Sequence, residues 1–215
     1  MDAHILFQDE HLLVAYKPYD VLSEAHDSRP NMPAILRELC GGEIYPVHRL
    51  DRTTQGLMVY ARDRSTAAAL SEVIREGRMH KTYLAAAEGA ADDGGELRDL
   101  LYYDRERNKS FVVKRERKGV KEAVLRYERL GVGEYNGAAV SLLRVGLITG
   151  RTHQIRVQFA SRRHPLIGDR RYGSSIRADH IALCCCELNF PHPVTGKELP
   201  FTYTPDDGVF QLFQN

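Results

Sequence analysis

The chain has 215 residues, of which 43% are hydrophobic and 27% are charged, and its formal net charge is +1. This length suffices for one substantial core or for two small ones. The composition is ordinary for a globular protein, and the sequence contains no apolar run long enough to cross a bilayer. Its first residues also lack the basic and apolar regions of a secretory signal. We therefore expect a cytoplasmic protein without a membrane span.

The four cysteines predict neither a disulfide framework nor a zinc site. Cys40 stands alone, and Cys184, Cys185 and Cys186 are consecutive, without the two-residue gap that lets paired thiolates bind one zinc ion. On a strand, the first and third of this run point to one face and the second points to the other. We interpret them as small apolar side chains of a reduced interior and expect no metal.

In chain order, apolar stretches bounded by Gly, Pro or Asp predict strands at 11–18, 56–61, 81–89, 122–130 and 138–148, the last two forming a hairpin closed by GVGEYNG. Apolar side chains at helical spacing predict helices at 32–40, at 65–77 and from near Thr149. Strands and helices do not alternate strictly, which favours an α+β fold with a largely antiparallel mixed sheet and flanking helices. Because no repeat or low-complexity linker interrupts the chain, we expect one domain over residues 1–215.

The third predicted helix lies in the segment TGRTHQIRVQFAS. Ile155 and Phe159 are spaced to face the core, whereas Thr152, His153 and Arg156 are spaced to share another face. Two interpretations of Arg156 stay open from spacing alone: a solvated helix surface or a functional guanidinium.

Asp51 lies within a cluster of charge, between Arg49 and Arg52 and just before an apolar stretch. Neighbouring cations favour the ionised form of a carboxylate, so Asp51 is available as a nucleophile or base at neutral pH. The alternative is a salt bridge in an exposed loop.

Residues 105–118 hold seven Lys or Arg against two Glu, a balance that suits a phosphate backbone. A solvated hairpin is the alternative, because charge runs often cover solvent-exposed faces.

Four motifs follow one another along the chain: VHRLDRTTQGL, HKTYLAA, LITGRTHQIRVQFAS and HPLIGDRRYG. Together they resemble the RluA family of pseudouridine synthases, in the short form without an S4 RNA-binding domain. The resemblance runs from ILFQDEHLLVAYKP to FTYTPDD, nearly the whole chain. It implies a pseudouridine synthase fold with a central catalytic cleft, and a cofactor-independent isomerase that converts uridine in RNA to pseudouridine.

The resemblance also implies roles for individual residues. Asp51 corresponds to the catalytic aspartate, Tyr83 to the tyrosine that stacks on the target uracil and handles protons, and Arg156 to the arginine that pairs with the catalytic carboxylate. Arg49 corresponds to the residue that enters the RNA stack where the target base leaves it. Without its motif, Tyr83 would more simply be a core residue of an apolar strand.

The chemistry agrees with these roles. The reaction breaks the N1–C1′ bond, rotates the freed uracil and rejoins it through C5, so the nucleotide must leave the stack, at a cost of a few kcal/mol. An aromatic side chain and a planar cation can replace the lost stacking. Uracil chemistry of this kind needs no redox centre or metal, so we expect no cofactor. We expect further substrate or RNA contacts from His48, Arg52, Thr54, Lys81, Arg151 and His153.

Three stretches depart from the family pattern. Thr54, Gln55 and Gly56 replace the usual Thr-Ser-Gly, Tyr19 and Asp20 follow the Lys-Pro turn where Gly is usual, and LCCCEL replaces Leu-His-Ala. The changes at Gln55 and after the Lys-Pro turn leave one alternative open, an RNA-binding or RNA-folding protein without catalysis. A second alternative is an Asp-dependent hydrolase of a nucleoside or sugar, because a carboxylate that attacks an anomeric carbon is also glycosidase chemistry. Transfer RNA and ribosomal RNA both fit as substrate, and we expect a monomer without a protein partner.

Overall fold

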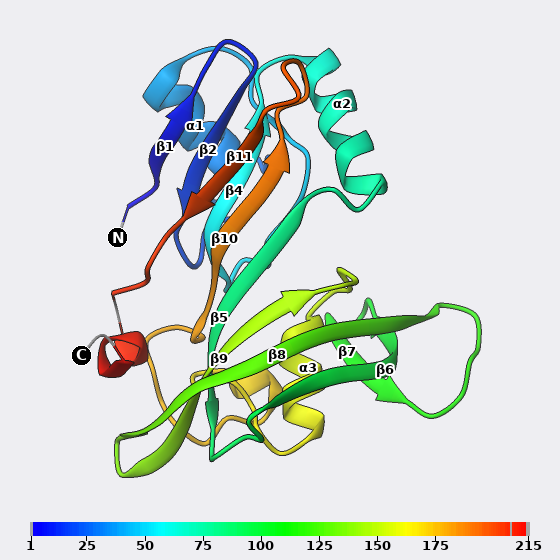
Figure 1. Ribbon diagram of the computed structural model, residues 1–215, viewed down its shortest axis with the longest axis vertical. Coiled ribbons are helices and arrows are strands. Elements are labelled where there is room, and N and C mark those ends of the chain that lie inside the picture. Colours follow the sequence, from blue (N-terminus) through cyan, green and yellow to red (C-terminus); the bar gives the residue numbers. More distant parts are fainter. Residues whose placement is uncertain (1, 207, 214–215) are drawn as a thin grey trace. The chain divides into compact units, whose positions relative to one another are not determined.

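The computed structural model describes residues 2–206 and 208–213, and its chain forms two compact units (Figure 1). Unit 1 comprises Met1–Lys81 and Cys184–Thr204, and unit 2 comprises Thr82–Leu183 and Pro205–Asn215. The chain thus leaves unit 1 once and returns to it for its last strands. That both units form one domain stays a prediction, and residues 1, 207 and 214–215 of that predicted domain lie outside the described residues.

Unit 1 is a strand array flanked by two helices. Its strands pair in the order β1-β2-β4-β10-β11, and β3 also pairs with β4. Among the named strands that the structure describes in this unit, β4 and β10 pair in parallel and the other pairs are antiparallel. In chain order the elements are β1 (His4–Gln8), β2 (Leu12–Lys17), α1 (Met32–Cys40), β3 (Tyr45–Pro46), β4 (Gln55–Ala61), α2 (Arg64–Arg75), β10 (Leu183–Pro191) and β11 (Glu198–Thr202).

The core of unit 1 forms because β2 and β4 are buried along their whole length. Leu and Val side chains of these strands pack with Leu70 and Val73 of α2 and with Leu188 and Phe190 of β10. The two helices begin where the sequence places an N-cap residue: the side chain of Asn31 accepts a hydrogen bond from Ala34, and that of Asp63 accepts one from Thr66.

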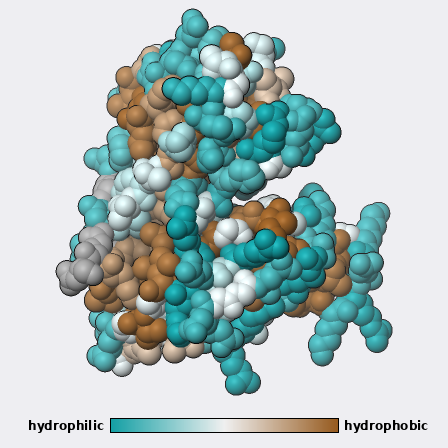
Figure 2. Space-filling view, viewed as in Figure 1, coloured by the Kyte–Doolittle hydropathy of each residue, from teal (hydrophilic) through white to brown (hydrophobic). Residues whose placement is uncertain are grey.

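Unit 2 is built on five antiparallel strands in the order β5-β9-β8-β6-β7. Leu101, Ala123 and Val157 form a small buried cluster, against which Tyr172 packs. Figure 2 shows a hydrophilic surface over the β6–β7 hairpin and the loop that leads to β8. The elements are β5 (His80–Glu88), β6 (Gly94–Asp104), β7 (Lys109–Val113), β8 (Val120–Tyr135), β9 (Ala138–Leu147), α3 (Gln154–Ser161), and the short 3-10 helices η1 (Arg170–Tyr172) and η2 (Gly208–Phe213).

The predicted α+β class with a largely antiparallel sheet is confirmed, and all five predicted strands are present. The predicted hairpin is also present, but its closing loop is shorter than GVGEYNG. β8 continues through Tyr135, and Asn136 and Gly137 alone turn the chain, with φ of 51° and 77°. An Asn-Gly pair with positive φ at both positions suits a two-residue hairpin turn.

The third helix differs from its prediction at the N-terminal end. It begins at Gln154, because His153 adopts a left-handed conformation with φ of 54°. Thr152 therefore precedes the helix, and its predicted face shared with Arg156 is wrong. Ile155 and Phe159 are buried as predicted, and Arg156 is buried with them at 4% exposure.

The cysteines behave as predicted: none forms a disulfide, Cys40 is half-buried, and Cys184, Cys185 and Cys186 are buried. None of the described helices is long and apolar enough to span a membrane.

Gly56 makes the parallel pairing of β4 and β10 possible. Its φ is +119°, and a Cβ at this position would lie 2.3 Å from the carbonyl oxygen of Cys185, with which Gly56 is in register. Any side chain must therefore push β10 away.

We expect Gly56→Ala to lower the free energy of unfolding by more than about 2 kcal/mol, because it adds both backbone strain and a clash. Urea denaturation followed by circular dichroism measures this. The control is Gly146→Ala, since a Cβ there has no neighbour within 4 Å. Equal stability of the two variants would show that β10 does not need this close approach.

Candidate active site

The predicted site residues are divided between the units. His48, Arg49, Asp51, Arg52, Thr54 and Lys81 belong to unit 1, and Tyr83, Arg151, His153 and Arg156 belong to unit 2.

Asp51 lies in the segment between β3 and β4, whose main chain is fixed on both sides of it. The Ser23 hydroxyl donates to the Leu50 carbonyl at 2.8 Å and accepts from the Leu50 amide at 3.0 Å. The Asp51 carbonyl accepts from Thr54 N at 2.9 Å, and the Arg52 carbonyl accepts from Asp20 N at 2.7 Å. Each neighbour of Asp51 is therefore held by a group from the loop after β2, which limits how far the half-buried Asp51 can move.

Lys17 is the buried centre of this arrangement. Its side chain is fully buried at the end of β2, and its Nζ donates to the carbonyls of Pro18 at 2.8 Å, Val21 at 2.8 Å and Arg52 at 3.3 Å. Three carbonyl oxygens match the three N–H groups of an ammonium. Lys17 thus joins the loop after β2 to the residue that follows Asp51.

Electrostatics at Lys17 work in opposite directions. Burial lowers the pKa of Lys17 to about 7, because the charged form loses its hydration, while the carboxylates of Asp51 and Asp20 favour that charged form. Lys17 and Asp51 are therefore electrostatically coupled: a proton gained or lost at Nζ changes the field at the Asp51 carboxylate.

The two arginines beside Asp51 pair with acids of the same unit. Arg49 lies 3.7 Å from Glu24, and Arg52 lies 3.4 Å from Asp20. All four side chains are exposed, so these pairs contribute little to stability. The Arg49 side chain is 68% exposed and is thus available to a large ligand.

The family departures are accommodated within unit 1. The Gln55 side chain is buried, and its Oε1 accepts from the Tyr16 hydroxyl at 3.0 Å. Asp20 adopts a φ of 65°, so it takes the left-handed conformation that the usual Gly would take easily. Neither departure displaces the hydrogen bonds around Asp51, which weakens the motive for an RNA-binding protein without catalysis.

Of three further predicted residues of unit 1, one is buried, and the other two, His48 and Lys81, are half-buried. Thr54 is buried at 3% exposure. His48 Nε2 accepts from Val59 N at 3.1 Å, and burial, together with the charge of Lys81, holds the pKa of His48 well below its usual value. Burial also lowers the pKa of Lys81. His48 therefore supports the backbone of β4 as a neutral ring, and the predicted RNA contacts of these residues stay predictions.

In unit 2, Tyr83 lies in β5 opposite Val145 of β9 and is 5% exposed. Arg156, on α3, forms a buried two-point ion pair: its Nε and Nη2 donate to the two carboxylate oxygens of Asp169 at 2.7 and 2.9 Å. Its guanidinium also lies 5.1 Å from the ring centre of Tyr172. Asp169 and Tyr172 thus fix the orientation of Arg156, and the predicted pairing of Arg156 with Asp51 stays a prediction.

His153 and Arg151 are held by the same part of unit 2. His153 Nδ1 lies 3.0 Å from the Tyr172 hydroxyl, which accepts from Ser110 N at 2.8 Å. Arg151 Nε donates to the Glu122 carbonyl at 2.8 Å. Burial raises the pKa of Tyr172, so its hydroxyl stays protonated at neutral pH.

Sequence reasoning missed Lys17, Asp169 and Tyr172 as parts of the site. A lysine at the end of the apolar run LLVAYK was the available signal for the first, and an Asp and a Tyr in HPLIGDRRYG for the others. Among the residues that the structure describes, no cluster of His, Cys, Asp or Glu could hold a metal ion.

Lys17 should make stability depend on pH. A lysine in the unfolded chain keeps its proton up to the ordinary pKa of 10.5, whereas Lys17 in the folded chain, with its pKa lowered by burial, releases its proton near 7. Between these values the unfolded state binds more protons, so the free energy of unfolding should rise with pH, by up to about 1.4 kcal/mol per unit. We expect Lys17→Met to remove this rise, and the control Lys197→Met, at an exposed lysine, to retain it. Urea unfolding at pH 7.5, 8.5 and 9.5 is the measurement, and parallel curves for all three proteins would contradict the lowered pKa.

Comparisons with known proteins identify the family of this chain. Residues 11–161 match the family model described as RNA pseudouridylate synthase. The chain is 30% identical to tRNA pseudouridine synthase C of Vibrio parahaemolyticus, over 99% of this chain and 94% of that protein. It is 33% identical to the dual-specificity RNA pseudouridine synthase RluA of Vibrio vulnificus, over 97% of this chain and 88% of the other.

Among solved structures, human RNA pseudouridylate synthase domain containing 1 has a TM-score of 0.81 at 21% identity, covering 99% of this chain and 94% of its own. This similarity supports the same fold. The matched family model and the two relatives show that the chain belongs to the RNA pseudouridine synthase family, as an isomerase of the RluA type.

Proposed function

We propose that this pseudouridine synthase isomerises uridine in transfer RNA, with Asp51 as its reactive carboxylate. The observation that carries the proposal is the fixed main chain around Asp51, held by Ser23, Lys17 and Asp20. A reactive group must be held in position to gain rate from proximity, and this segment meets that requirement.

The reaction needs three events at one nucleotide. The N1–C1′ bond breaks, the uracil rotates, and a C5–C1′ bond forms, while the proton at C5 passes to water and N1 takes up a proton from water. The Asp51 carboxylate supplies the negatively charged oxygen that acts on the sugar or the ring carbon. No other substrate is consumed, so the sum of atoms in the RNA is unchanged.

The remaining roles rest on chemistry and on the family motifs. We propose that the Tyr83 ring stacks on the uracil, that Arg156 pairs with Asp51, and that the exposed Arg49 fills the gap left in the RNA stack. Both units then contribute to one catalytic domain.

Transfer RNA is the favoured substrate because relatives that match nearly all of this chain are named tRNA pseudouridine synthase C. Other relatives are named for dual specificity or for the large ribosomal subunit. RNA is thus the substrate partner, and the experiment below compares transfer RNA with ribosomal RNA.

The decisive experiment measures tritium released to water from RNA labelled at uracil C5. We expect wild-type protein to release label from transfer RNA, and Asp51→Asn to slow release by about 1000-fold or more while RNA binding persists. The control is Asp93→Asn, which changes an exposed carboxylate that pairs with Arg129. Turnover by Asp51→Asn at the wild-type rate would end this mechanism, and release from ribosomal RNA alone would move the substrate to the ribosome.

We further propose that the protein acts as a monomer in the cytoplasm, where its RNA substrates are found. Light scattering after size exclusion should then give the mass of one chain, 24.4 kDa, at micromolar concentration. A mass of twice this value would instead indicate a dimer.

A further inference from the structure

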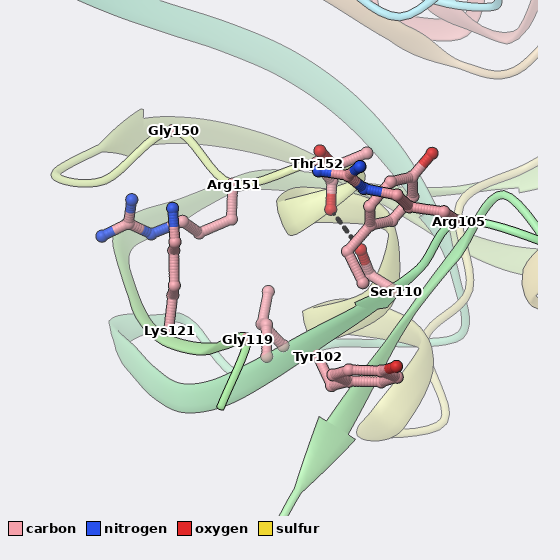
Figure 3. A pocket seen from close by; sticks show the side chains of 10 residues that line it. Tyr102, Arg105, Ser110, Gly119, Lys121, Gly150, Arg151 and Thr152 are labelled. Carbon is pink, nitrogen blue, oxygen red and sulfur yellow. Dashed lines mark hydrogen bonds between the residues drawn. The ribbon is translucent and has the colours of Figure 1, made fainter. Parts of the chain in front are cut away.

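A pocket of about 330 Å³ lies wholly within unit 2, apart from the side chains assigned to catalysis (Figure 3). Strands β6, β7 and β8 and the segment before α3 surround it. Its volume is at the lower end of the range for small-ligand pockets. The lining residues used below are Tyr102, Arg105, Ser110, Lys121, Arg151 and Thr152.

The pocket has an excess of positive charge. The side chains of Arg105 and Lys121 make no hydrogen bond or ion pair with any residue that the structure describes, and Arg151 is bonded through Nε to a backbone carbonyl. In Figure 3, Lys121 and Arg151 extend side by side at one end, and Arg105 lies at the other. Such cations are suited to an anion from solution.

Two acids next to pocket residues in the chain are paired with other arginines: Glu122 pairs with Arg98 at 2.7 Å, and Asp104 lies 3.7 Å from Arg107. Glu106, next to Arg105, is exposed and does not line the pocket. The lining holds three cations and no carboxylate, so an anionic ligand would meet little repulsion from it.

The floor of the pocket is fixed before any ligand binds. The Ser110 hydroxyl donates to the Thr152 carbonyl at 2.5 Å, which ties β7 to the segment before α3. The Tyr102 ring is held under the Arg117 guanidinium, 4.7 Å from the ring centre. Tyr102 therefore offers an aromatic surface in a defined orientation. Sites for single-stranded nucleic acid combine such aromatic surfaces with cations, and this pocket has both.

We infer that this pocket binds one nucleotide of the substrate RNA other than the reacting uridine, with its phosphate at Lys121 and Arg151 and its base or ribose toward Tyr102. The inference rests on the proposed function, because it takes RNA as the substrate. The pocket borders Thr152, one residue before His153 and close in the chain to Arg156. A nucleotide bound here would orient the strand that carries the target uridine. It would also give the basic segment 105–118 a direct role in RNA binding.

The test measures RNA binding alone, in an Asp51→Asn background, so that it does not depend on turnover. Fluorescence anisotropy with labelled transfer RNA gives the Kd over a range of salt concentrations. We expect Lys121→Gln and Arg105→Gln each to weaken binding by about 3- to 10-fold and to reduce the slope of log Kd against log salt by about 0.7 to 0.9. Tyr102→Leu should weaken binding with little change in that slope, because stacking is not ionic.

The matched control is Lys114→Gln, which removes an exposed lysine of the same basic segment that does not line the pocket. It should change Kd by less than about twofold. Equal effects of Lys114→Gln and Arg105→Gln would overturn the inference, since the charge of segment 105–118 and not the pocket would then bind RNA.

A second arm adds uridine monophosphate or inorganic phosphate as competitor. Displacement of RNA only at millimolar or higher concentrations supports a site built for the polymer. Tight binding of the free nucleotide, with RNA affinity unchanged in the pocket variants, would instead assign the pocket to a small metabolite. If wild-type protein released no tritium, the proposed function would be contradicted. If the pocket variants kept the Kd of the Asp51→Asn protein for transfer RNA, only the inference about the pocket would be contradicted.

Discussion

The hydrogen bonds from Lys17 to the carbonyls of Pro18, Val21 and Arg52 are the constraint on which the rest of this site depends. The ammonium group of Lys17 lies in the interior of unit 1, and its hydrogen bond to the Arg52 carbonyl holds the main chain next to Asp51. Removing a lysine from water costs free energy, and only good partners recover that cost. Here the partners are backbone carbonyls, so the bonds fix the path of the main chain, while the charge of the Asp51 carboxylate favours the protonated form of Lys17. Lys17 therefore both holds the main chain beside Asp51 in position and interacts with the charge of the Asp51 carboxylate.

In unit 2, an ion pair rather than bonds to backbone carbonyls fixes a buried basic side chain. Arg156 is held in the interior by both oxygens of Asp169 and lies against the ring of Tyr172, whose hydroxyl is in turn bonded by Ser110. A buried guanidinium with a two-point carboxylate partner has a defined direction as well as a charge. The same Ser110 connects, through its hydroxyl, to the floor of the cationic pocket. One small network thus sets both Arg156 and the surface that we assign to RNA.

The sequence predicted those helices and strands whose positions follow from apolar periodicity and helix caps. The bounds of α1 were right because Asn31, Pro33 and the apolar spacing agree, and the strands predicted at 11–18 and 56–61 were found because LLVAY and LMVYA are unbroken apolar runs. Strand β6 was missed because it mixes Glu, Arg and Asp with Leu, as an exposed strand does. The start of α3 was wrong because no local signal marks His153 for a left-handed conformation. The Arg52 carbonyl that binds Lys17 lies 35 residues further along the chain, and Asp169 lies 13 residues after Arg156, so only the folded chain identifies these partners.

The two-part composition of unit 1 has a consequence for synthesis on the ribosome. Unit 2 draws its five-stranded array from one uninterrupted stretch, whereas β4 of unit 1 finds its parallel neighbour β10 only after more than a hundred further residues have been made. Until then the backbone of Gln55 and Gly56, immediately after the Asp51 segment, lacks that neighbour in the nascent polypeptide. Unit 1, which bears the aspartate that we propose as reactive, is thus completed last, and a chain released early would keep the Arg156 network without a finished support for Asp51.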